Sequence, residues 1–196
     1  MMKILSVLLL AAILAACGND RPVVQRQLFM IQTERPGRPV QPVAESLRIG
    51  RVAMASPFDE RALVYRRDDV RYETDIYNQF ASDPADMLAD AIAGWLRQSG
   101  LFRRVVPPGA AGGADYRLET SVSSLYVDFQ VEPPAAVLDV RWRLTKEGES
   151  GSVLELDCRE RADLKERSPE GAVRAQRQAL EQALGRLERA LGSVTL

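Results

Sequence analysis

The strongest constraint on the fold is a strict alternation of apolar and polar residues in the C-terminal half of the chain. One side of the segment 136–144 carries Ala136, Leu138, Val140, Trp142 and Leu144, and the other side is largely charged. Successive side chains of a strand point to opposite faces, so this pattern predicts a strand in a sheet with one covered face. The segments 114–129 and 152–161 are predicted as neighbouring strands, the first long enough to bend or bulge midway. An antiparallel sheet is the expected arrangement.

Two segments have the periodicity of amphipathic helices. The first begins at Asp83-Pro84, has apolar residues at helical spacing up to Leu96, and ends at Gly100. The second begins at Ser168-Pro169-Glu170. The residues predicted to form its buried stripe are Val173, Gln176, Leu180, Ala183, Leu184, Leu187 and Leu191. A partner-binding or membrane-surface role for the second helix is the alternative to packing on the sheet. We predict an α+β fold, with an antiparallel sheet and two amphipathic helices packed on one face.

Shorter elements are expected in the N-terminal half. The segment 27–32 is a candidate first strand, and 34–44 holds three prolines and is predicted as an extended loop. The apolar phase shifts between Ile49 and Val52, which predicts a bulge near Gly50-Arg51. Residues 62–66 and 69–73 are predicted as a hairpin.

The N-terminus has the pattern of a bacterial lipoprotein signal. Lys3 precedes an apolar run of about thirteen residues, too short for a transmembrane helix. The run ends in Leu14-Ala15-Ala16-Cys17, which resembles a lipobox, and the alternative is an ordinary signal peptide. The resemblance implies a signal peptide at 1–16, a tether at 17–26 and a periplasmic domain at 27–196. It also implies acyl chains such as palmitate on Cys17 as a membrane anchor. In bacterial lipoproteins an aspartate directly after the lipidated cysteine favours retention in the inner membrane. Gly18 stands at that position here, so the resemblance implies delivery to the outer membrane.

Composition excludes several familiar chemistries. The chain has no histidine, so it lacks the commonest general base and the usual zinc ligand. Its 26 basic and 27 acidic residues give a net charge of −1, which gives no reason to expect a nucleic-acid partner. Cys158 lies in phase with Leu154 and Leu156 and is predicted to be a buried, inert thiol. We predict a protein that is not an enzyme, with no cofactor and no metal site.

The segment 65–80 is unusually rich in aromatic residues. It contains Tyr65, Tyr72, Tyr77 and Phe80, with Arg66 beside the first. Packing of these rings against the sheet and the Trp95 helix is one interpretation. The other is an aromatic surface for a protein partner or an acyl chain. On the second interpretation the candidate contact residues are Tyr65, Arg66, Tyr77 and Phe80.

An ordered set of short segments across residues 27–191 resembles the ABC-type transport auxiliary lipoprotein family. The segments are Ser46-Leu47-Arg48-Ile49-Gly50, Leu63-Val64-Tyr65-Arg66, Tyr77-Asn78-Gln79-Phe80, Pro84 with Met87-Leu88, Ser99-Gly100-Leu101-Phe102, Leu125-Tyr126-Val127-Asp128-Phe129 and Ala135-Ala136-Val137-Leu138. The resemblance implies a non-catalytic lipoprotein that works with an MCE protein, a permease and an ATPase in lipid transport. It places the lipid-bearing cysteine at Cys17. Some members assemble as rings, so a homo-oligomer is one possible assembly.

Two other classes of function remain at this stage. One is an assembly lipoprotein that supports an outer-membrane β-barrel, as in lipopolysaccharide insertion. The other is a periplasmic hydrolase, which requires a nucleophile and a base to lie together.

Overall fold

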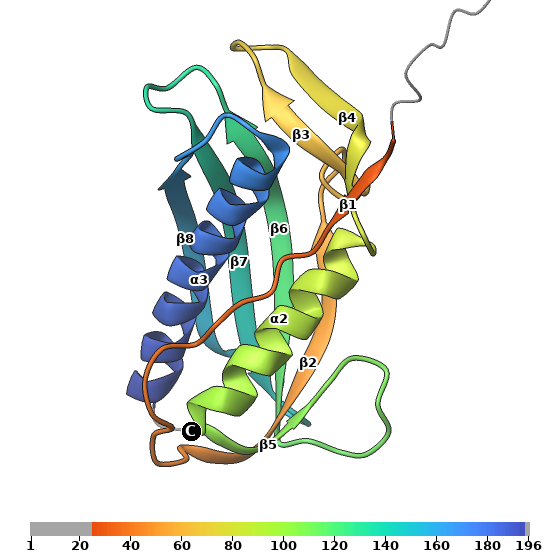
Figure 1. Cartoon of the computed structure of the whole chain (residues 1–196). Coiled ribbons are helices and arrows are strands. Elements are labelled where there is room, and N and C mark those ends of the chain that lie inside the picture. Colours follow the sequence, from red (N-terminus) through yellow and green to blue (C-terminus); the bar gives the residue numbers. More distant parts are fainter. Residues whose placement is uncertain (1–24, 195–196) are drawn as a thin grey trace, which may run out of the picture.

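A computed structural model describes residues 25–194; Cys17 and the predicted signal peptide lie outside this range. The strands are β1 (Gln27–Phe29), β2 (Ala44–Met54), β3 (Ala62–Arg66), β4 (Tyr72–Phe80), β5 (Phe102–Val106), β6 (Tyr116–Asp128), β7 (Ala135–Lys146) and β8 (Ser152–Asp163). The helices are α2 (Pro84–Ser99) and α3 (Pro169–Ser193). The strands form one sheet, and both helices lie on the same face of it (Figure 1). The α+β class is therefore confirmed.

The sheet is mixed, which corrects the prediction of an antiparallel one. Antiparallel pairs join β3 to β4, β6 to β7 and β7 to β8. Parallel pairs join β2 to β5, β2 to β6, β3 to β6 and β1 to β4. Alternation shows which face of a strand is buried but carries no information about its direction. Helix α2 carries the chain back along the sheet, so β5 starts again at the same end as β2.

Strand β6 is the centre of the sheet and has three neighbours. One edge pairs with β7 along its length, while the other edge is shared by β2 and, near Val127 and Asp128, by β3. The hairpin β3–β4, with β1 added at its outer edge, therefore extends past the end of β2 (Figure 1). The predicted hairpin is confirmed, and β4 is longer than expected.

The expected irregularities within the long strands are present. The register of β2 against β6 shifts between Ile49 and Val52, as the change of phase predicted. A Cβ atom at Gly50 would lie 2.9 Å from the carbonyl oxygen of Leu118, so glycine permits the close approach of the two strands. Strand β6 has its own shift between Val122 and Ser124.

The helix boundaries follow the predicted start and stop residues. The Ser168 hydroxyl accepts a hydrogen bond of 3.0 Å from the Gly171 N–H at the start of α3. Asp83 occupies the corresponding position before α2, but its side chain makes no capping hydrogen bond. Gly100 ends α2 with a φ of +75°, a left-handed conformation that favours glycine.

The core lies between the sheet and the two helices. Helix α2 packs on β2 and β5, and α3 packs on β7 and β8. All seven residues of the predicted α3 stripe are buried. Trp142 on β7 and Trp95 on α2 are also buried, with exposed fractions of 0% and 4%.

The chain between β1 and β2, residues 30–43, is an irregular strap that runs beside α2 and then passes in front of the C-terminal part of α3 (Figure 1). The Val40 N–H donates to the Ser99 carbonyl at 2.8 Å, and the Val43 N–H donates to that of Leu101 at 2.8 Å. Near its middle, Arg35 reaches Glu188 of α3. The strap thus joins the two helices on the side away from the sheet.

Candidate binding surfaces

Exposed apolar side chains gather on β1 and the β3–β4 hairpin. Of the seven large hydrophobic residues exposed within residues 25–194, six lie on these elements or directly beside them. They are Leu28, Met30, Val70, Tyr72, Ile76 and Tyr77; the seventh is Val40, on the strap. Scattered exposed apolar residues are normal on protein surfaces, whereas a local concentration marks a candidate contact surface.

A bulge in β4 produces the most prominent part of this surface. Ala62 pairs with Gln79, but the next residue, Leu63, pairs with Asp75, so β4 contains extra residues at this point. The Asp75 carboxylate accepts hydrogen bonds of 3.0 Å from the backbone N–H groups of Tyr77 and Asn78, which holds the turn. Ile76 is consequently 57% exposed and Tyr77 is 49% exposed.

The structure separates the four residues predicted as a contact site. Tyr65 and Phe80 face the core and are 9% and 2% exposed. Tyr77 is exposed, and Arg66 is half-buried with its guanidinium 3.5 Å from the carboxylate of buried Asp128. The proposed contacts at these four positions stay a prediction, and the structure makes only Tyr77 and Arg66 accessible.

The buried members support the hairpin from within. The Tyr65 hydroxyl donates a hydrogen bond of 3.4 Å to Asp75, the residue that holds the bulge. Burial, followed by the negative charge of Asp75, raises the pKa of Tyr65 well above its usual range, so the hydroxyl remains a donor. The Arg67 guanidinium lies over the Tyr65 ring at 5.4 Å and over the Phe129 ring at 4.7 Å.

A second aromatic cluster fixes the other side of the hairpin. Tyr72 contacts Tyr126 with ring centroids 5.4 Å apart and Phe58 with centroids 6.3 Å apart. Phe58 and Tyr126 stack on each other at 5.9 Å. Sequence reasoning did not connect Phe58 and Tyr126 with this region, because they come from the β2–β3 turn and from β6.

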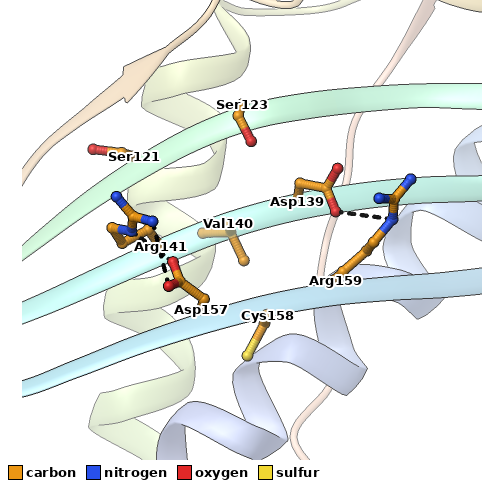
Figure 2. Close-up of a pocket in the computed structure, with 8 residues that line it drawn as sticks. All are labelled: Ser121, Ser123, Asp139, Val140, Arg141, Asp157, Cys158 and Arg159. Atoms are coloured by element: carbon orange, nitrogen blue, oxygen red, sulfur yellow. Dashed lines mark hydrogen bonds and ion pairs between the residues drawn. The ribbon is translucent and has the colours of Figure 1, made fainter.

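The charged face of β6, β7 and β8, on the side away from the helices, forms a shallow pocket (Figure 2). Arg141 is bonded to Asp157 at 2.6 Å, and Asp139 lies 3.4 Å from Arg159. In each of these cross-strand pairs the two charges neutralise each other, as is usual on a solvated sheet face, although Asp139 is half-buried. Figure 2 shows the Cys158 side chain pointing away from these pairs toward α3.

Four candidate nucleophiles lack the surroundings that would activate them: Cys158, Ser121 and Ser123 at the pocket, and Ser46 on β2. Cys158 is a buried free thiol, as predicted, and burial raises its pKa, which disfavours the reactive thiolate. Ser121 and Ser123 line the pocket beside already paired charges. Ser46 does donate to the Asp115 carboxylate at 2.6 Å, but it also accepts from the Asp115 N–H and is only 4% exposed. That pair joins β2 to the start of β6.

Neither a metal site nor a membrane-spanning helix is evident within residues 25–194. In this part of the chain no group of acidic and cysteine side chains is placed to hold a metal ion. Neither helix there combines the length and the apolar character needed to cross a bilayer.

Comparison with known proteins identifies the family. The model of the ABC-type transport auxiliary lipoprotein component matches residues 29–187, so the chain belongs to that family. No curated protein matches it at a significant level.

Solved structures share the fold at low sequence identity. A Xanthomonas campestris protein of the DUF330 family is 18% identical, with a TM-score of 0.73 over 82% of this chain and 92% of that one. A second, uncharacterised protein is 18% identical, with a TM-score of 0.65 over 81% of this chain and 98% of that one. A hypothetical protein from Chlamydia trachomatis is 10% identical, with a TM-score of 0.51 over 76% of this chain and 98% of that one.

Proposed function

We propose that this protein is a lipid-anchored, periplasm-facing component of an ABC lipid transport system of the MCE type, and that it acts by docking and not by catalysis. The observation that carries the proposal is the family match over residues 29–187. The side chains agree with it, because the charged pocket holds neutralised ion pairs and the free thiol is buried.

The proposed anchor is diacylglycerol and a further acyl chain on Cys17, with the tether ending at β1. Three acyl chains would hold the protein at a membrane essentially permanently, since each buried CH₂ group contributes about 0.8 kcal/mol. Gly18 after the cysteine supports delivery to the outer membrane. The MCE protein, which would bridge the periplasm from the permease and its ATPase, is the proposed partner.

The hairpin is the part of the domain best suited to contact. Tyr77 and Arg66 are accessible there, while Tyr65 and Phe80 hold the hairpin in place from the core side. Tyr77 and Arg66 are therefore proposed as the contacts with a partner or with lipid, and Tyr65 and Phe80 are proposed to position them.

The function can be tested by following radiolabelled phospholipid between the inner and outer membranes of cells that lack the protein. We expect slower exchange, restored by the full-length chain but not by Cys17→Ser. Unchanged exchange together with defective assembly of an outer-membrane barrel would contradict the proposal and favour an assembly lipoprotein.

A further inference from the structure

Four exposed apolar residues lie where the tether joins the domain. Leu28 is on β1, Met30 follows it, and Ile76 and Tyr77 form the β4 bulge; each is about half exposed. Gln27 of β1 pairs with Asn78 of β4, so the strand that continues the tether lies directly beside the bulge. These four residues are named the edge patch.

The length of the tether limits how far the edge patch can lie from the lipid. Cys17 and Gln27 are separated by residues 18–26, and a fully extended chain of this length spans about 35 Å at most. That limit is comparable to the diameter of about 40 Å expected for a compact domain of this length, so it permits several orientations at the membrane. The apolar character of the patch would select one of them.

The chemistry of the edge patch suits a bilayer surface. Leu28, Met30 and Ile76 are aliphatic, and the Tyr77 ring has an apolar body with a polar hydroxyl, the type of side chain enriched at the level of lipid headgroups. A small apolar surface that is immersed at a bilayer interface loses contact with water without needing a shaped partner.

The charges of the β3–β4 hairpin, which carries two of the four patch residues, are balanced. In the hairpin Arg67 pairs with Glu73 at 2.6 Å, and Arg71 lies 3.3 Å from Asp68. A polybasic surface would attract anionic lipid, but this one offers no such excess. The contact should therefore depend on apolar side chains and be nearly independent of the charge of the lipid.

We infer that the edge patch rests on the lipid surface of the membrane that carries the anchor, so that the domain stands with its β1–β4 end toward the bilayer. The inference rests on the proposed acylation of Cys17.

Val40 lies at the end of the domain opposite to the edge patch. It bonds to Ser99 at the end of α2, whereas Ala81, just before the start of α2, bonds to Phe29 of β1. Sixteen helical residues, about 24 Å, separate these two levels.

The test uses full-length lipidated protein with an environment-sensitive nitrobenzoxadiazole dye on Ile76→Cys or, as a matched control, on Val40→Cys. Both positions are exposed and apolar, and buried Cys158 should stay unlabelled. The proteins are placed in phosphatidylcholine vesicles with and without nitroxide-bearing lipid. We expect several-fold stronger quenching at position 76 than at position 40, unchanged when phosphatidylglycerol is added.

A second variant separates contact by the patch from proximity due to the tether. Replacing Leu28 and Tyr77 by serine in the Ile76→Cys protein should markedly reduce the quenching; quenching that survives would overturn the inference. Equal quenching at positions 76 and 40 would overturn it as well. The inference would also be overturned if the dye at position 76 were not quenched in vesicles alone and became shielded from water only when the transport partner was added. The patch would then be a protein interface.

Intact-mass measurement distinguishes the two levels of the argument. If the mass shows no lipid on Cys17, the protein has no anchor, and the inference fails together with that part of the proposed function. A lipidated chain without quenching at position 76 overturns the inference alone.

Discussion

Glu188 joins three segments of the fold, so its removal should destabilise the protein strongly. Its Oε1 accepts a hydrogen bond of 2.6 Å from Arg35 Nη2 on the strap, and its Oε2 accepts bonds from Arg35 Nε at 2.9 Å and from Trp95 Nε1 on α2 at 2.7 Å. The Arg35 side chain is only 6% exposed and that of Glu188 is 18% exposed. The variant Glu188→Ala removes all three bonds at once.

The structure sets the size of the expected loss. Breaking a buried ion pair by removing one partner costs about 3–5 kcal/mol, because the remaining charge is left without its counter-ion. Arg35 keeps hydrogen bonds to the carbonyl groups of Gly37 and Arg38, and this partial compensation favours the lower end. We expect Glu188→Ala to lower the free energy of unfolding by about 3 kcal/mol.

The assay is urea unfolding of non-lipidated Cys17→Ser protein, followed by the fluorescence of Trp95 and Trp142, the two tryptophans of the chain. Glu181→Ala is the matched control, because Glu181 lies on the same helix and makes only weak contacts: one exposed bond from the strap and a long ion pair of 3.9 Å with Arg177. Its loss should stay below about 1 kcal/mol. A Glu188→Ala protein that is no less stable than the control would refute the reasoning.

Three other predictions concern acid, the core and the anchor. The hydrogen bond from Arg35 lowers the pKa of Glu188 below its ordinary value of 4.5, so its contribution to stability is full above that pH and is lost as the pH falls through the lowered pKa. The stability advantage of the unsubstituted chain over Glu188→Gln should therefore shrink in acid urea titrations, and a constant advantage would argue against this assignment. Trp95→Ala should cost about 3–5 kcal/mol in the same assay, and a change near zero would contradict the burial of Trp95. Cys17→Ser should give a folded, soluble domain by circular dichroism, because the described core lies wholly outside the anchor; an unfolded or insoluble product would count against this.

Local features of the fold could be predicted from the sequence because they depend on nearby residues. The helix starts at Pro84 and Pro169 follow from proline and its polar neighbours, and the α3 stripe follows from helical spacing. The bulge in β2 was predicted from a change of apolar phase, which one strand displays by itself. The burial of Cys158 followed from its phase with Leu154 and Leu156.

Features that depend on distant segments could not be predicted in this way. The parallel pairing of β2 with β6 results from the path of the chain through α2, which alternation does not record. The contact of Arg35 with Glu188 joins residues 153 positions apart. The aromatic density of 65–80 pointed to the hairpin, but only the turn at Asp75 determines that Tyr77 faces outward while Phe80 faces the core.

The central claim is tested most directly by purifying the tagged, lipidated full-length protein in gentle detergent and identifying the proteins and lipids that accompany it. We expect recovery of an MCE protein together with its permease and ATPase. Recovery of an outer-membrane β-barrel without these components would contradict the transport function.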